Sequence, residues 1–375
     1  MKTPLCQRLG IEFPLFAFSH CRDVVAAVSR AGGMGVFGAV TYTPEELDRE
    51  LAWIDANCGG RPYGVDLIVP NSLQGAGQAI GPEQALAALP QEHRAFVAET
   101  LAARGIDPTD LDTARAASVD FINNLNESGA DRMLDVAFSH PIALIANALG
   151  TPPPVMTERA RAAGIPVAAL VGARKHAEAQ LAAGVDILIA AGGEAGGHCG
   201  EVSTMVLVPE VVAIAGDTPV LAAGGIVTGA QMAAAMAMGA AGAWCGSVWL
   251  TTAEAEPPQA IKDRMLAASS SDTVRSRSRT GKTSRQLKSA WTEAWEREGP
   301  VPLPMPLQSL LTEPALDKVA RLAESGHEGA GDLATYWVGQ GVGLMTQAMS
   351  AGAVVQAFKE DYIAAAERLM ATLEE

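Results

Sequence analysis

The sequence lacks the marks of a secreted, membrane-spanning or disulfide-linked protein. No apolar run reaches about 18 residues without a polar or glycine interruption, which argues against a membrane-spanning helix. The first ten residues contain no long apolar core of the kind found in signal peptides. The cysteines are odd in number, scattered and never spaced as CxxC, so we expect a reduced, cytoplasmic protein without disulfides or a metal site. They are Cys6, Cys21, Cys58, Cys199 and Cys245.

Basic and aromatic residues are also scarce. The chain has 27 Lys and Arg against 42 Asp and Glu, which gives a formal net charge of −15. Binding to nucleic-acid phosphates needs clustered Lys and Arg, so this composition excludes a nucleic-acid-binding protein. Aromatic residues make up 5% of the chain and hydrophobic residues 49%, a balance rich in alanine and glycine that suits close packing of helices on strands.

Eight short apolar runs alternate with amphipathic segments. Apolar runs of this length bounded by glycine are typical of buried parallel strands, and the segments between them supply right-handed helical crossovers. We therefore predict an α/β fold, a closed (β/α)8 TIM barrel, although an open doubly wound sheet fits the same local pattern. The predicted strands are residues 13–18, 34–40, 63–69, 142–148, 167–171, 185–190, 220–223 and 242–245.

Two segments depart from this alternation. Residues 71–135 contain alanine-rich helical pieces, around residues 82–89, 94–104 and 111–125, and no clear strand, so we expect a helical insertion in a barrel built from residues 1–70 and 136–268. The insertion would serve as a scaffold or subunit contact, or as a substrate lid. Residues 269–375 are expected to form a helical C-terminal extension that packs on the barrel, with helices at residues 284–298, 316–324 and 354–374. A basic run within it, residues 275–285, is expected to be a solvated surface loop rather than a phosphate site.

One strand end stands out because it delivers a histidine into a glycine-rich turn. The apolar run 185–190 is followed by five glycines between Gly192 and Gly200, with His198 among them. Glycine lets the backbone approach a ligand closely, and an imidazole can act as a base near neutral pH. His198 is therefore the candidate catalytic residue. Cys199 is a poor candidate nucleophile, because adjacent side chains usually point apart.

The last two predicted strands also end in glycine turns. Gly224 and Gly225 follow the seventh strand, and Gly246 and Ser247 follow the eighth. In closed barrels the loops after these two strands commonly bind a phosphate, because free backbone N–H groups converge there. The pattern predicts a phosphorylated cofactor.

These motifs resemble those of the nitronate monooxygenase family, formerly called 2-nitropropane dioxygenases, which are FMN-dependent barrels. The similarity covers most of the chain outside the insertion. The resembling segments are SRAGGMGVFG (29–38), GGEAGGHCGE (192–201), AAGGIVTG (222–229), MGAAGAWCGSVW (238–249), TGKTSRQLKSAWTEAWE (280–296) and GQGVGL (339–344).

The resemblance assigns roles to individual residues. His198 corresponds to the family's catalytic histidine, the base that removes the α-proton of a nitroalkane. The implied FMN site consists of Phe18 and Asp66 beside the isoalloxazine ring, Gly196 and Gly197 near the flavin, and Gly224, Gly225, Gly246 and Ser247 around the phosphate. Asp66 stands where the family usually has asparagine, a change that removes a donor and adds a negative charge if the acid is ionised.

The resemblance therefore implies an FMN-dependent oxidoreductase that oxidises alkyl nitronates or nitroalkanes with O2 to carbonyl compounds and nitrite. Residues 196–212 are also similar to flavin-dependent enoyl-acyl-carrier-protein reductases, so an NAD(P)H-dependent enoyl-thioester reductase is an alternative. A third alternative is a non-catalytic protein that binds flavin or another phosphorylated ligand. The expected partners are a small-molecule substrate and O2, with no nucleic acid or membrane. The use of NAD(P)H and the formation of a homo-oligomer are left open.

Overall fold

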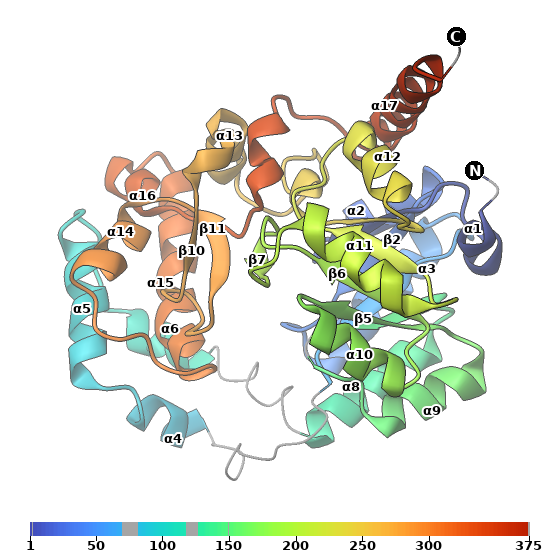
Figure 1. The fold of residues 1–375 in the computed structure, drawn as a ribbon. Helices are drawn as coiled ribbons and strands as arrows, with labels where there is room; N and C mark the ends of the chain where they lie inside the picture. Colours follow the sequence, from blue (N-terminus) through green and yellow to red (C-terminus); the bar gives the residue numbers. More distant parts are fainter. Residues whose placement is uncertain (2, 70–81, 118–126, 149, 374–375) are drawn as a thin grey trace.

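Eight parallel strands close into a barrel at the centre of the molecule. The computed structural model describes residues 1, 3–69, 82–117, 127–148 and 150–373. Within them the strands follow the order β1-β2-β3-β4-β5-β6-β8-β9, and β9 pairs with β1 (Figure 1). This closure confirms the predicted barrel and excludes the open sheet. The strands are β1 (Leu15–Ser19), β2 (Met34–Gly38), β3 (Gly64–Leu67), β4 (Leu144–Asn147), β5 (Val167–Val171), β6 (Ile187–Ala191), β8 (Val220–Ala223) and β9 (Gly242–Cys245).

Alternation along each strand divides its side chains between the barrel interior and the surrounding helices. The interior is filled by large apolar side chains such as Phe16, Met34 and Trp244, all 6% exposed or less. Helix α1 (Pro4–Leu9) adds its buried residues to the same cluster and so closes the amino end of the barrel. The opposite, carboxyl end remains free to carry a site.

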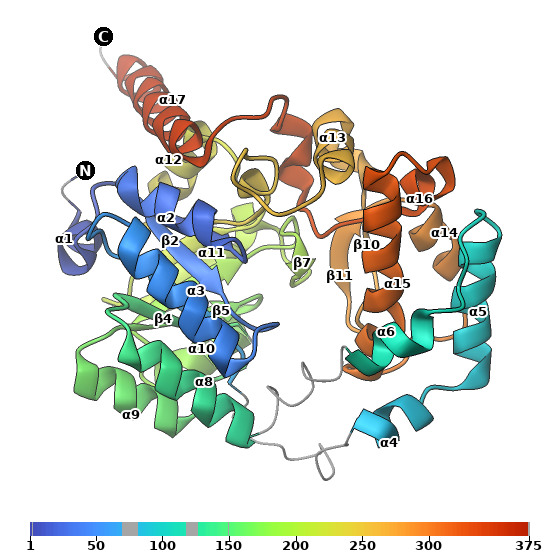
Figure 2. The same cartoon turned by 180° about the vertical axis from the view of Figure 1, so that it is seen from behind.

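A ring of helices covers the outside of the barrel. Helix α17 packs against both α12 and α2, so the end of the chain returns to complete the ring between β9 and β1 (Figure 2). The helices in this ring are α2 (Arg22–Arg30), α3 (Pro44–Asn57), α8 (Glu127–Ser139), α9 (Pro154–Ala163), α10 (Arg174–Ala182), α11 (Thr204–Ala215), α12 (Gly229–Ala237) and α17 (Ala351–Ala371). Helix α3 begins at the capping box formed by Thr43 and Glu46, as its sequence predicts.

Helix α11 begins earlier than its sequence suggests. Because Pro209 is typical of a first turn, the sequence predicts a helix at residues 209–215, but the helix starts at Thr204 and carries Pro209 inside it. The carboxylate of Glu194 accepts a hydrogen bond from the backbone N–H of Thr204 at 2.8 Å. This distant cap satisfies a free N–H of the first turn, which local sequence reasoning could not foresee.

A second lobe lies beside the barrel and combines distant parts of the chain (Figure 1). Its sheet consists of β10 (Thr273–Ser276), β11 (Ser284–Leu287) and β7 (Gly197–His198), in the order β10-β11-β7. Helices α5 and α6 from residues 71–135 pack on α15 of this lobe. The helices of the lobe and its junction with the barrel are α4 (Pro82–Ala87), α5 (Gln91–Ala102), α6 (Leu111–Ala117), α13 (Gln259–Ala267), α14 (Ala290–Arg297), α15 (Leu307–Glu324) and α16 (Glu328–Leu333).

Two expectations for the C-terminal extension were wrong in detail. Residues 275–285 were expected to form a solvated loop, but they begin in β10 and end in β11 with a turn between them, and Arg279 and Arg285 are only 5% and 9% exposed. A helix was predicted from residue 284, whereas residues 284–287 form β11 and α14 begins at Ala290. The cause is tertiary pairing, because β11 lies between two antiparallel partners and its basic side chains find internal acceptors.

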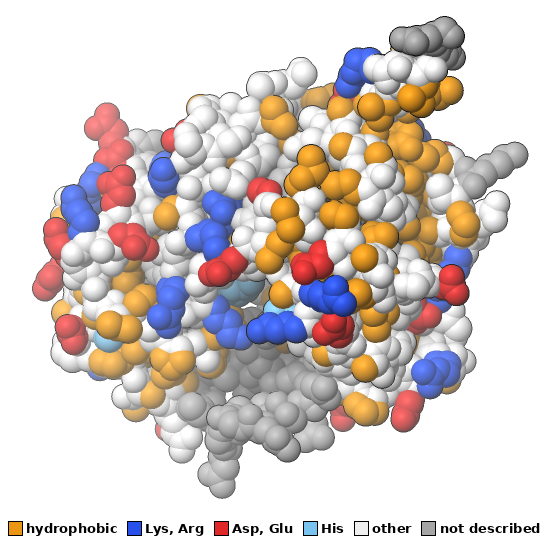
Figure 3. Space-filling model, viewed as in Figure 1, with side chains coloured by type: hydrophobic (Ala, Val, Ile, Leu, Met, Phe, Trp, Pro, Cys, Tyr) orange, Lys and Arg blue, Asp and Glu red, His pale blue; other side chains and the backbone are white. Residues whose placement is uncertain are grey.

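No helix among the described residues is long and apolar enough to cross a membrane. Apolar side chains do gather on one face of the molecule, over α11, α12 and the projecting end of α17 (Figure 3). Exposed members include Met205 and Val206 on α11, and Ile363 and Met370 on α17. The part of the predicted insertion helix that falls on residues 118–125 lies outside the described residues.

Candidate active site

His198 belongs to a strand shared by the barrel loop and the second lobe. The glycine-rich loop leaves β6, and its residues Gly197 and His198 form β7, which pairs with β11. In this register Ser284 lies opposite His198, and Arg285 lies opposite Gly197. Pairing fixes the backbone beneath the histidine, although the loop itself is rich in flexible glycine.

The hydroxyl group of Thr280 holds the imidazole. Nε2 of His198 lies 2.8 Å from Oγ1 of Thr280. The same hydroxyl donates to the carbonyl of Lys282 at 3.1 Å and accepts from the Lys282 N–H at 3.3 Å. A hydroxyl has a single proton, so with that proton on Lys282 O its oxygen can only accept from the histidine. We infer that Nε2 carries the proton and that Nδ1 offers the free lone pair.

The surroundings of His198 keep its imidazole neutral. The residue as a whole is exposed, while its Nε2 faces Thr280 and the charged groups of Lys282 and Glu313 act on the ring. Loss of hydration, with a smaller contribution from the Lys282 ammonium group, lowers the pKa of His198 to about 4. The ring is therefore neutral at pH 7, with a proton on one nitrogen and the other nitrogen able to accept one.

Two charged side chains hold the glycine-rich loop in place. The guanidinium group of Arg285 donates two hydrogen bonds to the carbonyl of Gly193, at 3.1 and 2.8 Å. The carboxylate of Glu194 caps α11 and also accepts from the Thr204 hydroxyl at 2.9 Å. These contacts fasten the loop at its start, before the chain reaches His198.

The glycine turns after β8 and β9 meet this loop at the carboxyl end of the barrel. Gly224 and Gly225 have φ angles of +106° and +71°, a region that side chains rarely adopt. The hydroxyl of Ser247 accepts a hydrogen bond from the Gly339 N–H at 2.8 Å. A Cβ at Gly196 would lie only 2.8 Å from the same Gly339 nitrogen, so this crossing requires glycine.

The two turns also present free backbone donors. Among the described residues, the N–H groups of Gly225 and Gly246 have no protein acceptor. Unpaired N–H groups at adjacent strand ends are able to bind an anion, which is what the sequence predicts for a phosphate at these turns. The structure thus brings Gly196, Gly224, Gly225, Gly246 and Ser247 together with the histidine loop.

Phe18 lies beside the turn after β9, and Asp66 lies two strands further round the barrel mouth, on β3. The ring of Phe18 stacks on Trp244, with centroids 6.3 Å apart, and packs against Gly38. Asp66 pairs in register with Gly38 of β2, which the Phe18 ring contacts. Phe18 and Asp66 therefore lie at the same end of the barrel. Asp66 is 3% exposed, and its Oδ1 has no hydrogen-bond partner among the described residues.

His20 belongs to the same group of side chains. Its Nδ1 lies 2.7 Å from the carbonyl of Gly38, and its ring meets Phe18 edge to face. Burial lowers the pKa of His20, so this ring is also neutral. His140, which shares the Phe-Ser-His triplet, instead contacts Asp55 at 2.7 Å away from the mouth.

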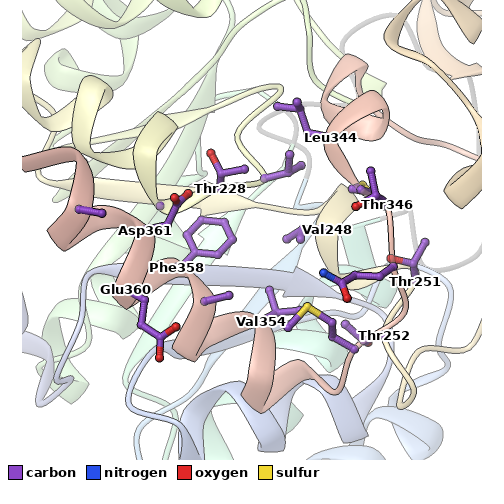
Figure 4. Close-up of a pocket in the computed structure, with 17 residues that line it drawn as sticks. Thr228, Val248, Thr251, Thr252, Leu344, Thr346, Val354, Phe358, Glu360 and Asp361 are labelled. Carbon is purple, nitrogen blue, oxygen red and sulfur yellow. The ribbon is translucent and has the colours of Figure 1, made fainter. Parts of the chain in front are cut away.

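A cavity of about 480 Å3 lies behind the glycine turns (Figure 4). It is bounded by Thr228, Val248, Thr251 and Phe358, which come from α12, the segment after β9 and α17. None of the predicted cofactor residues lines it. Val248 of its lining directly follows Ser247, so the cavity adjoins the turn after β9.

Sequence reasoning missed three residues that organise this site. Thr280 and Lys282 fall in a motif quoted only for its resemblance, and Arg285 was grouped with a basic surface run. The motif TGKTSR (280–285) was the available signal, since it places a hydroxyl among the basic residues. Without the pairing of β7 and β11, nothing connects it with a histidine 82 residues away.

The fold and the site together define a class of protein: a barrel enzyme with a histidine and free backbone donors at the carboxyl end of its strands. Comparison with known proteins gives the family. Residues 2–361 match the model of the nitronate monooxygenase family. The chain belongs to this family and is an oxidoreductase.

Individual relatives agree with this assignment. A Mycobacterium tuberculosis protein named "Putative monooxygenase Rv1533" is 52% identical over 365 residues, which cover 97% of both chains. A "Probable nitronate monooxygenase" of Staphylococcus haemolyticus is 28% identical over 358 residues, covering 91% of this chain and 92% of the relative. The nitroalkane oxidase from Streptomyces ansochromogenes has a similar structure, with a TM-score of 0.78 and 25% identity over 98% of this chain and 100% of that one.

The fold is shared more widely. FabK from Thermotoga maritima aligns with a TM-score of 0.73 and 24% identity over 99% of both chains. At this identity the match concerns the fold alone.

Proposed function

We propose that this chain is an FMN-dependent enzyme that oxidises alkyl nitronates or nitroalkanes with O2 to carbonyl compounds and nitrite. The observation that carries the proposal is the neutral His198, fixed by β11 and Thr280 beside the glycine turns after β8 and β9. Membership of the nitronate monooxygenase family supports the same reaction.

The residues at the barrel mouth fit FMN. The unpaired N–H groups of Gly225 and Gly246 suit its phosphate, because they supply donors without bringing in side chains. A Cβ at Gly197 would meet no atom within 4 Å, so the backbone at this residue is open to a ligand. Phe18 offers an apolar surface, and the orphaned Oδ1 of Asp66 offers a polar one. Gly196, Gly224 and Ser247 would complete the site.

His198 would act as the general base. A nitroalkane bound beside the imidazole would give its α-proton to Nδ1, while Nε2 keeps its proton and its hydrogen bond to Thr280. The imidazolium that forms would gain from Glu313, whose charge raises the pKa of His198 against the effect of Lys282. When bound, FMN supplies the redox chemistry, and O2 is the final electron acceptor.

A second candidate is an enoyl-thioester reductase that takes hydride from NADH or NADPH. The similarity of residues 196–212 to such enzymes favours it. In that reaction His198 would orient or protonate the thioester substrate. A third, non-catalytic candidate would bind the phosphorylated ligand without turnover.

One anaerobic experiment separates these candidates. The FMN-loaded protein is mixed in turn with an alkyl nitronate, NADH and NADPH, and the flavin absorbance is followed. We expect loss of the oxidised flavin spectrum with the nitronate alone. Rapid reduction by a nucleotide would favour the enoyl reductase, and no reduction by any of the three would favour the non-catalytic protein.

A further inference from the structure

A buried acid, Asp66, lies in the barrel wall away from the histidine loop. Asp66 is the second-last residue of β3, and its direct neighbours in register are Gly38 on β2 and Ala146 on β4. Ala146 belongs to the interior cluster, whereas Val65 and Leu67 belong to the outer one. Because strand side chains alternate, the carboxyl group of Asp66 faces the barrel interior near its carboxyl end.

The strands around this carboxyl group offer it no counter-charge. Strands β1, β2 and β4 carry no titratable side chain in their described residues. The nearest titratable group that faces this wall is His20, just after β1, whose ring contacts Gly38 and is itself neutral. Lys282 and Glu313 act on His198, and neither contributes to the ionisation of Asp66.

These surroundings favour the neutral acid. Burial alone raises the pKa of Asp66 to about 8, since an unpaired carboxylate would lose its hydration with nothing to replace it. A protonated carboxyl group carries one O–H donor in addition to its acceptors. The orphaned Oδ1 is therefore the polar end of a neutral group that still lacks a partner.

We propose that Asp66 is a protonated acid that donates a hydrogen bond to an acceptor atom of the bound flavin ring. This assignment rests on the proposed function, because it needs the flavin at the barrel mouth. In its neutral form the carboxyl group offers one hydrogen-bond donor, as the amide of an asparagine would. An ionised Asp66 would offer no donor and would place a negative charge against the electron-rich edge of the ring.

The test measures FMN affinity of the apoprotein between pH 7 and pH 9.5, without any substrate. Asp66→Asn keeps the shape and a donor but cannot ionise, so it controls for every other titrating group, including FMN itself. The Kd of the wild type divided by that of Asp66→Asn should be about 1 at pH 7. It should rise to roughly 30 at pH 9.5, since only the protonated acid binds and each pH unit above its pKa costs about tenfold. A ratio that stays within about threefold over this range would overturn the assignment.

A second variant tests donation directly. Asp66→Leu has a similar size and no donor, and it should weaken FMN binding at pH 7 by about three- to tenfold, the usual contribution of one hydrogen bond. Equal affinity of wild type and Asp66→Leu would contradict the proposal, and if this variant does not fold the Asp66→Asn ratio still decides. If the wild type binds FMN but the ratio of the two Kd values does not change with pH, the donor role of Asp66 is rejected and the proposed function is not.

A different result would reject the proposed function itself. If the wild type binds no FMN at any pH, the proposed function and the donor role both fall. In that case the apoprotein's melting temperature still reports the ionisation: the wild type should lose stability relative to Asp66→Asn as pH rises from 7 to 9.5. No such loss would show that the carboxyl group is not held neutral.

Discussion

The imidazole of His198 and the hydroxyl of Thr280, 82 residues apart in the chain, are 2.8 Å from each other. The histidine comes from a barrel loop and the threonine from the second lobe, and the pairing of β7 with β11 brings them together. The Thr280 hydroxyl contacts His198 and the backbone of Lys282, so it acts through the histidine. It is a positioning residue, and its effect should be on the tautomer.

Replacing Thr280 should therefore weaken proton abstraction without changing the redox site. We expect Thr280→Val to lower kcat/KM for a neutral nitroalkane by about three- to tenfold, as one hydrogen bond is lost. Turnover of a preformed nitronate should change little, because it needs no base. Thr280→Ser should restore most of the rate. Equal losses with both substrates would mean that Thr280 has a structural role only.

His198→Asn should separate proton transfer from oxidation even more strongly. The amide cannot act as a base at neutral pH, so turnover of neutral nitroalkanes should fall by about 10²- to 10⁴-fold. Binding of FMN and reaction with the preformed nitronate should persist. Steady-state kinetics with both forms of one substrate provide the measurement, and full activity on the neutral form would remove His198 as the base.

The lowered pKa of His198 predicts an acid limb in the pH profile. Activity on neutral nitroalkanes should stay level from pH 7 to about pH 5.5 and fall below that with a midpoint near 4. Lys282→Gln should move this midpoint upward, because it removes a positive charge that disfavours the imidazolium. A midpoint near 6.5 in the wild type would show that the ring is not desolvated as described.

The lowered pKa of His198 also makes the free energy of unfolding depend on pH. The folded-state pKa lies below the unfolded value of 6.5, so the folded protein binds fewer protons between these two pH values. The contribution of His198 is fully present above pH 6.5 and is lost as pH falls toward 4. Asp66 has the opposite sign: its raised pKa gives a contribution that is lost as pH rises from about 4 to about 8.

The stability of the second lobe should depend strongly on the buried ion pair between Arg279 and Glu313. Arg279 makes two hydrogen bonds of 2.8 Å with Glu313, and its guanidinium group lies 3.8 Å from the ring centroid of Trp337. The arginine side chain is 6% exposed, so Glu313→Ala leaves a buried charge without its partner. We expect a loss of roughly 3 kcal/mol in the free energy of unfolding, near the low end for buried pairs.

A matched control exists on α10, where Arg174 and Glu178 form an exposed pair at 2.9 Å. Glu178→Ala should cost less than about 0.5 kcal/mol. Chemical denaturation of both variants compares the two pairs in one protein. Similar losses would indicate that the Arg279 pair is solvated and does not hold the lobe together.

The barrel could be predicted from the sequence because its evidence is local. Each strand is a short apolar run that ends in glycine, and caps such as Thr43 with Glu46 mark where helices begin. The order of such units determines the parallel closure. His198 and the turns at residues 224 and 246 were predictable for the same reason, since loops after barrel strands meet at one end.

The second lobe could not be predicted in this way. Residues 284–287 look helical or exposed by themselves, and only the two strands on either side make them a strand. Arg285 is buried because the carbonyl of Gly193 accepts its hydrogen bonds, and that carbonyl lies 92 residues away. Contacts of this kind depend on how separate segments meet, which local composition does not record.

The shared strand β7 has a consequence for how this chain can be shortened or recombined. A chain ending at residue 268 would retain all eight barrel strands and both glycine turns, yet β11 and Thr280 would be gone. The histidine would then sit on an untethered glycine ribbon. Grafting the barrel alone onto another scaffold would transfer the glycine turns and His198 without the strand and hydroxyl that fix the histidine, so the barrel should be moved together with the second lobe.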